Sequence, residues 1–80
     1  MKTLGLIGGM SWESTLSYYR LINEAVRQRR GGLHSARLVL YSVGFHDLEV
    51  LRREGRWEVG CAVLAHAARA LDAAGAELLV

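Results

Sequence analysis

The stretch TLGLIGGMSWEST, residues 3–15, decides how this chain folds. The apolar run from Thr3 to Ile7 has the length of a buried strand rather than of a helix. After two glycines, Ser11 stands at a position typical of a helix N-cap. Glu13 follows in the first turn, where a negative charge favours the helix dipole. The pattern therefore predicts a strand, a tight turn and a helix in direct succession.

The predicted helix runs from this turn to Arg30. Its expected inward face is spaced by threes and fours, which is the period of a helix. The members of that face are Leu16, Tyr19, Ile22, Asn23 and Val26. Basic residues at its end suit the dipole, and the pair Gly31–Gly32 predicts its stop.

The same alternation continues to the end of the sequence. We expect a second strand over Arg37–Val43, a short helix over Phe45–Arg53, a long helix over Trp57–Ala74 and a third strand over Glu77–Val80. The long helix carries a stripe that predicts a buried face. Its members are Trp57, Cys61, Leu64, Ala68 and Leu71.

Strands that alternate with helices predict the α/β class, with a β-α-β-α-β order and an open parallel sheet of the Rossmann-like kind. Such a sheet needs helices on both faces and more than three short strands. The apolar run at Val80 has no polar residue after it. We therefore expect residues 1–80 to be the N-terminal part of a larger α/β domain that is truncated at its third strand.

Composition excludes several classes of function. Ten Lys and Arg residues against eight Asp and Glu, with no dense basic stripe, argue against a nucleic-acid partner. No stretch approaches the roughly 20 apolar residues that cross a bilayer, and the N-terminus lacks a signal-peptide pattern. A single cysteine allows no internal disulfide. We expect a cytoplasmic protein with no membrane partner.

The turn after the first strand is the first candidate for a binding site. Glycines at positions 5, 8 and 9 do not fit the dinucleotide fingerprint, and no Gly-Lys-Ser/Thr follows as in a phosphate-binding P-loop. Gly8 and Gly9 allow close backbone approach, and the helix that begins near Ser11 points free N–H groups toward the strand ends. The turn therefore suits a carboxylate or another small anion, or else it is a plain strand-to-helix connection.

Other reactive residue types have structural interpretations. We expect Cys61 to be a small core residue because it lies in the apolar stripe, and we expect Trp12 to pack beside the turn. The three histidines, His34, His46 and His66, show no metal-ligand spacing. Arg52 follows the second strand, so its side chain could reach the crevice and pair with a carboxylate.

Several of these segments together resemble the aspartate/glutamate racemase family, and most closely its bacterial broad-specificity amino-acid racemase branch. The segments are KTLGLIGGMSWEST (residues 2–15), YYRLINEAV (18–26), GGLHSARLVLYSV (31–43), GRWE (55–58) and AAGAELLV (73–80). The likeness covers all 80 residues, and GGMSWEST and GGLHSA are specific to the branch.

The resemblance implies an isomerase that inverts the α-carbon of acidic and some other amino acids without pyridoxal phosphate, metal or nucleotide. Two α/β domains face each other across the active site, and each supplies one acid/base group, usually a cysteine. One cysteine lies in a Cys-Thr-Asn-Thr stretch beyond the third strand and the other in the second domain. Both are expected outside this chain, so no catalytic residue is predicted here and the chain alone is expected to be inactive.

The resemblance also implies a small amino-acid substrate and a homodimer for the longer protein. Met10 matches a substrate-contacting methionine, and Arg52 stands where the branch often has a substrate-contacting Gln. With Gly9 and Ser11 of the turn, these two complete the predicted substrate-binding set; no metal ligand or cofactor is predicted. The alternative is a fragment that binds a small carboxylate or anion without chemistry.

Overall fold

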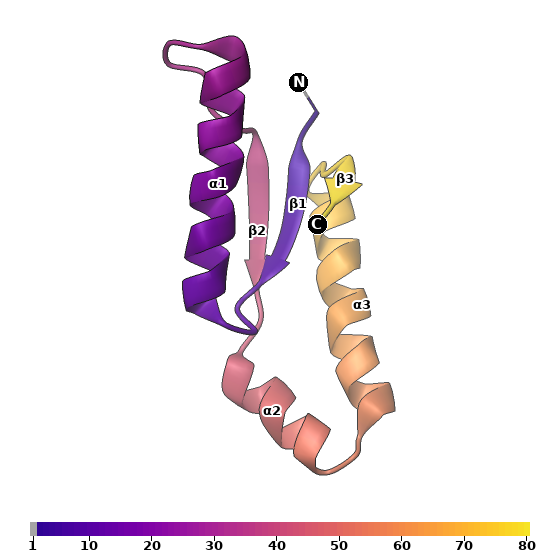
Figure 1. Ribbon diagram of the computed structural model, residues 1–80. Helices are drawn as coiled ribbons and strands as arrows, with labels where there is room; N and C mark the ends of the chain where they lie inside the picture. The colour runs from indigo at the N-terminus through magenta and orange to yellow at the C-terminus, as the bar shows by residue number, and fades with distance from the viewer. Residues whose placement is uncertain (1) are drawn as a thin grey trace.

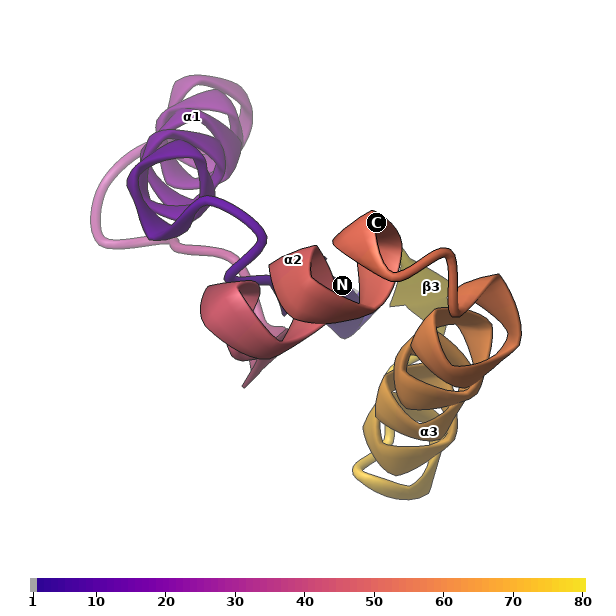
Figure 2. The ribbon, with the colours of Figure 1, turned by 90° about the horizontal axis from the view of Figure 1, so that it is seen from below.

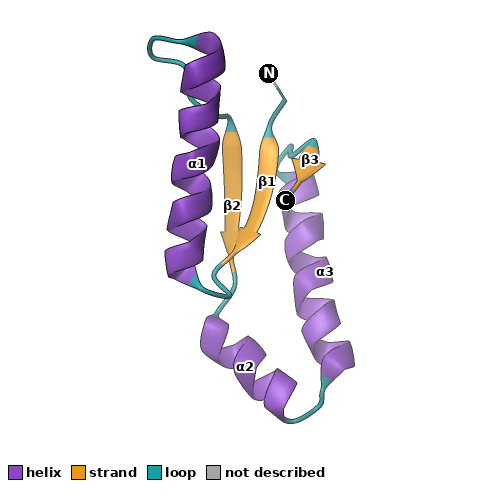
Figure 3. Ribbon diagram, viewed as in Figure 1, coloured by secondary structure: helices purple, strands orange, loops and turns teal. Residues whose placement is uncertain are grey.

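The structure, a computed structural model, describes residues 2–80. Those residues form three strands and three helices in the order β1 (Leu4–Gly8), α1 (Trp12–Arg30), β2 (Leu38–Ser42), α2 (Phe45–Arg53), α3 (Trp57–Ala73) and β3 (Leu78–Leu79) (Figures 1 and 3). Every predicted element is confirmed, with bounds that differ by at most two residues. Within residues 2–80, none of the helices has the length and apolar character needed to cross a bilayer.

The sheet is parallel, and its first strand lies in the middle. The strand order is β2-β1-β3, with Leu4 opposite Leu38 on one side and opposite Leu78 on the other. The chain therefore winds to one side of β1 first and crosses to the other side afterwards. This reversal beside the central strand is the topological switch point at which open α/β sheets bind ligands.

The two long helices lie on opposite faces of the sheet (Figure 2). Crossovers between parallel strands are nearly always right-handed, so two crossovers that travel in opposite directions place their helices on opposite faces. The short helix α2 lies beyond the ends of β1 and β2, on the side where those strands finish (Figure 1). The predicted α/β sheet with helices on both faces is confirmed.

Two glycines of the central strand let a helix approach each face. A Cβ on Gly5 would lie 2.8 Å from Ala76 Cβ and 3.3 Å from Leu71 Cβ on the α3 side. A Cβ on Gly8 would lie 2.6 Å from Thr15 Oγ1 on the α1 side. The buried apolar side chains of the described residues are Leu6, Val43, Ala67 and Leu71. The core is therefore concentrated between β1, the end of β2 and the second half of α3.

Helix α1 is packed less closely than its pattern predicts. It holds no buried residue: Ile22 and Val26 are half-buried, but Leu16 and Tyr19 are 59% and 54% exposed. The side chain of Asn23 ties the helix to the segment before β2, because its Oδ1 accepts a hydrogen bond from the Ala36 N–H at 2.8 Å. A polar tie thus supplements apolar burial on this face.

The prediction that Cys61 is a core residue is wrong. Cys61 is exposed, and Trp57, four residues earlier in the same stripe, is 62% exposed. The reason lies in how α3 meets the sheet: its second half covers β1 through Ala67 and Leu71, whereas its first half runs past the strand ends beside α2 (Figure 1). The expectation that Trp12 packs beside the turn is also wrong: Trp12 is the first residue of α1, and its side chain is 62% exposed.

Candidate functional site

The turn after β1 is held against the end of β2. Gly9 has a φ of +89°, which L side chains rarely adopt, and a Cβ there would lie 2.5 Å from Ser42 Oγ and 2.8 Å from Val43 N. The Val43 N–H donates to Gly8 O at 2.8 Å. The turn therefore requires glycine at position 9 both for its conformation and for its space, as the sequence predicts.

Helix α1 begins at this turn with free backbone donors. Ser11 is at the N-cap in an extended conformation (φ −153°, ψ 106°), but its side chain makes no capping hydrogen bond. Instead, Ser11 Oγ donates to Glu13 Oε2 at 3.2 Å. Because the first N–H groups of a helix have no partner within the helix, they remain available to a ligand at the strand ends.

Thr15 fastens the first turn of α1 to the glycine turn. Its Oγ1 accepts a hydrogen bond from the Gly9 N–H at 3.0 Å and donates to Ser11 O at 3.3 Å. One hydroxyl thus fixes the position of Gly9 relative to the helix start. The two residues between Gly9 and the start of α1, Met10 and Ser11, are presented at the carboxyl end of β1.

A cavity of about 360 Å³, here called the turn pocket, opens at this point. Its walls come from the end of β1, the turn, one face of α1 and the end of the chain beside β3. The lining residues are Leu6, Ile7, Gly8, Gly9, Met10, Ser11, Ser14, Thr15, Tyr18 and Val80. The pocket lies between β1 and β3, at the topological switch point. Its volume is within the range of small-molecule sites.

The structure brings three of the four predicted substrate-binding residues together. Gly9, Met10 and Ser11 all line the turn pocket, and Met10 is 46% exposed. Ser14, Thr15, Tyr18 and Val80 also line this pocket and were not predicted from the sequence. The helix members could have been found from their spacing, because positions 11, 14, 15 and 18 share one face of a helix. Val80 gave no such local signal.

Arg52 lies elsewhere, in a separate cavity of about 200 Å³ between α2 and α3, which Cys61 and Trp57 also line. Its guanidinium forms two hydrogen bonds to the carboxylate of Glu49, one of them from Nε at 3.0 Å. This hydrogen-bonded pair lowers the pKa of Glu49 below its usual value and raises the pKa of Arg52. In this structure Arg52 is therefore engaged by a neighbour on its own helix.

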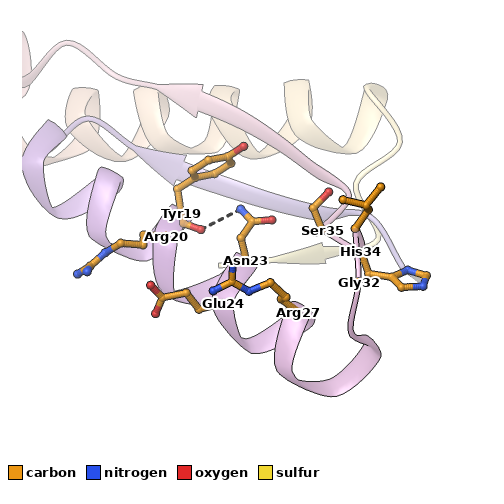
Figure 4. A pocket seen from close by; sticks show the side chains of 9 residues that line it. Tyr19, Arg20, Asn23, Glu24, Arg27, Gly32, His34 and Ser35 are labelled. Carbon is orange, nitrogen blue, oxygen red and sulfur yellow. Dashed lines mark hydrogen bonds between the residues drawn. The ribbon is translucent and has the colours of Figure 1, made fainter.

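Another cavity, of about 550 Å³, lies away from the turn pocket, between the second half of α1 and the segment that leads to β2 (Figure 4). Its central side chain, Asn23, is occupied by structural hydrogen bonds: Nδ2 donates to Tyr19 O at 2.9 Å, and Oδ1 accepts from the Ala36 N–H. This cavity is at the edge of the sheet opposite to the strand ends that bind ligands in open α/β folds.

In the described part of the chain, no histidine lines the turn pocket or the cavity that holds Arg52. His66 packs edge-on against Tyr41 with the ring centroids 6.1 Å apart, and His34 lies in the cavity beside α1. Within residues 2–80, no three side chains of the His, Cys, Asp and Glu types form a group that could hold a metal ion. The turn pocket is thus a site of hydroxyl groups, backbone N–H groups and apolar side chains.

Comparison with known proteins adds a family to this geometry. The sequence model of the family described as Asp/Glu/Hydantoin racemase matches residues 7–80. The crystal structure of a candidate Asp/Glu racemase from Yersinia pestis is similar over 99% of this chain, with a TM-score of 0.96 and 56% identity. An aspartate racemase homologue from Pyrococcus horikoshii OT3 is similar over 99%, with a TM-score of 0.87 and 38% identity. The chain spans 34% of the length of each of these two proteins.

The family model matches this chain from the end of β1 through the whole turn after it, and two solved relatives share the fold. These findings together assign the chain to a family. The parallel sheet, the glycine turn and the pocket at the switch point are the parts that these comparisons cover. This chain belongs to the Asp/Glu/hydantoin racemase family.

Proposed function

We propose that this chain forms one wall of the substrate site of an amino-acid racemase of the aspartate/glutamate type. The observation that carries the proposal is the turn pocket: it lies at the topological switch point, and it is built from the GGMS turn in a chain of the racemase family. The helix N–H groups at Ser11 to Ser14 suit a substrate carboxylate, and Met10 supplies an apolar contact beside it.

The reaction that we propose is a two-base proton transfer at the α-carbon. A thiolate on one face removes the α-proton, and a thiol on the opposite face returns a proton to the other side, which inverts the centre without a cofactor. A cysteine thiol is mostly protonated at neutral pH, so the thiolate must be stabilised by its surroundings. Cys61 does not serve this purpose in the proposal, because it lies outside the turn pocket. Both reacting cysteines are assigned to chain beyond these residues.

Two other expectations become part of the same proposal. The longer protein acts in the cytoplasm as a homodimer, in which residues 1–80 belong to the first of two α/β domains. Arg52 is the least supported of the four substrate-binding residues, because its guanidinium is paired with Glu49 and lines a different cavity.

Binding of substrate to the isolated chain tests the site. Aspartate or glutamate should shift the amide resonances of Gly9, Met10 and Ser11 in ¹⁵N-correlated NMR spectra, and Met10→Ala should weaken binding several-fold. Leu33→Ala is the matched control, because Leu33 is a fully exposed apolar residue on the loop after α1. Shifts confined to the cavity around Asn23, or no shifts at all, would contradict the assignment of the turn pocket.

The same sample tests whether the acid/base groups of the reaction lie within these 80 residues. In deuterated water the α-proton signal of bound aspartate should persist, because both acid/base groups are assigned outside these 80 residues. Loss of that signal would show that an acid/base group lies within this chain. Binding without exchange in a longer protein that contains both cysteines would instead favour the alternative, a carboxylate-binding protein without chemistry.

A further inference from the structure

Three of the hydroxyl groups that line the turn pocket, those of Ser11, Ser14 and Thr15, donate their protons to neighbouring residues. Ser11 Oγ donates to Glu13 Oε2 at 3.2 Å, Ser14 Oγ donates to Ser11 Oγ at 3.4 Å, and Thr15 Oγ1 donates to Ser11 O at 3.3 Å. A hydroxyl has one proton and two lone pairs. Each of these oxygens can therefore only accept a hydrogen bond from a ligand in the pocket.

Glu13 sets the direction of this chain of hydrogen bonds. An ionised carboxylate only accepts, so the proton shared with Glu13 must come from Ser11. The Ser11 oxygen then has only lone pairs left, so the proton between the two serines comes from Ser14. The Glu13 carboxylate does not line the pocket, but its hydrogen bond leaves the oxygens of Ser11 and Ser14, which do line it, with only lone pairs to offer.

The pocket consequently offers two kinds of group side by side. The backbone N–H groups of the first turn of α1 are donors without a side-chain cap, and the serine oxygens are acceptors backed by a negative charge. A phosphate, or a dicarboxylate that lacks an amino group, can use only the donors and is repelled by Glu13. An α-amino acid can use both, with its carboxylate on the N–H groups and its ammonium on the serine oxygens.

We infer that Ser11 and Ser14, oriented by Glu13, bind the ammonium group of the substrate, so that the turn pocket selects an α-amino acid over a plain anion. The inference rests on the proposed function and adds to it the residues that read the amino group. Ser11 and Ser14 contact the ligand in this arrangement, and Glu13 is a positioning residue that acts through Ser11.

A pair of matched ligands tests the inference. L-Aspartate and succinate differ only by the amino group, and succinate carries the larger negative charge at neutral pH. NMR titration of the chain should give a dissociation constant roughly tenfold lower for aspartate than for succinate, the size expected of a charge-assisted hydrogen bond. Inorganic phosphate should bind more weakly than aspartate. A simple anion site would give the reverse order for both comparisons.

Variants then assign the selectivity to these residues. Glu13→Gln should remove most of the preference for aspartate while leaving succinate bound at least as tightly, and Ser14→Ala should reduce the preference without a change in charge. Glu58→Gln is the matched control, because Glu58 lies in the first turn of α3 and makes the same change in charge away from the pocket. The control should keep the preference intact.

The results of these titrations distinguish failure of the ammonium-binding inference from failure of the proposed substrate site. If aspartate shifts the turn amides but binds no more tightly than succinate, or if Glu13→Gln and Ser14→Ala both keep the preference, the inference is wrong and the substrate site stands. If neither ligand shifts the turn amides in a folded chain, the substrate site and the inference are both wrong.

Discussion

At the scale of single residues, an added methyl group should have opposite effects on stability at Gly9 and at Gly60. Gly9→Ala should destabilise the fold by about 1–3 kcal/mol, since its φ is +89° and the new Cβ would meet Ser42 Oγ and Val43 N. Gly60→Ala should stabilise it by about 0.5–1 kcal/mol, since Gly60 is inside α3 and no atom lies within 4 Å of the added Cβ. Chemical denaturation followed by circular dichroism measures both changes.

Gly60→Ala is also the control for the first substitution, because both variants add one methyl group to a glycine. Equal effects in the two variants would show that the turn after β1 does not constrain position 9 as the structure describes.

The sequence alone predicted the residues of the turn but not the pocket around it. Gly9 and Ser11 follow from local rules for turns and helix starts, and both are where those rules place them. Val80 could not be predicted as a lining residue, because its position depends on which strand pairs beside β1. The missing side-chain cap of α1 could not be predicted either, because it depends on the hydrogen bond that Ser11 Oγ donates to Glu13 in the folded chain.

At the scale of elements, the ion pair on α2 should make this helix sensitive to acid. The guanidinium of Arg52 lowers the pKa of Glu49 in the folded state relative to the unfolded chain. The stabilisation is therefore complete above the ordinary pKa of a glutamate, and it is lost as the pH falls through the lowered value. An NMR titration of the Glu49 carboxyl should give a midpoint that rises in Arg52→Gln.

Arg53→Gln is the control for this titration, because Arg53 Nε is 4.0 Å from the same carboxylate and forms a weaker pair. Its effect on the midpoint should be smaller. An unchanged midpoint in Arg52→Gln would contradict the hydrogen-bonded pair.

The elements themselves were predictable because each is bounded by strong local signals. Gly31 and Gly75 adopt positive φ where helices α1 and α3 end, as expected of helix C-termini. Which part of an element is buried was less predictable. The stripe on α3 continues from Leu71 back to Trp57, but the sheet beneath it ends sooner, so Cys61 and Trp57 are exposed.

At the scale of the whole molecule, the chain is thin and exposes many apolar side chains. Its radius of gyration is 14.4 Å, against about 12 Å for a compact domain of this length, and its smallest dimension is 12 Å. Trp12, Leu16, Leu40 and Leu79 are among the large apolar residues that are about half exposed or more. We expect the isolated chain to self-associate, which sedimentation velocity would reveal as a coefficient that rises with concentration.

A sedimentation coefficient that stays at the monomer value across the concentration range would contradict this expectation. Arg69→Ala is a suitable comparison, because it removes an exposed polar side chain from α3 and leaves the exposed apolar residues unchanged. It should self-associate at least as readily as the unmodified chain.

The α/β class and the parallel sheet were predictable at this scale, but the strand order was not. Alternating strands and helices require crossovers, and crossovers between parallel strands are right-handed. Neither rule states whether β3 pairs with β2 or returns to β1. The return places Leu78 beside Leu4, and it creates the switch point at which the turn pocket lies.

The central position of β1 also has a consequence for how the chain is made. Thr3 and Glu77, which hydrogen-bond to each other, are 74 residues apart. A ribosome that adds 5–20 residues per second needs about 4–15 seconds to span that distance. During this time β1 can pair with β2 but has an open edge on its other side. The most buried of the three strands, β1, therefore remains paired on only one edge until β3 has been synthesised.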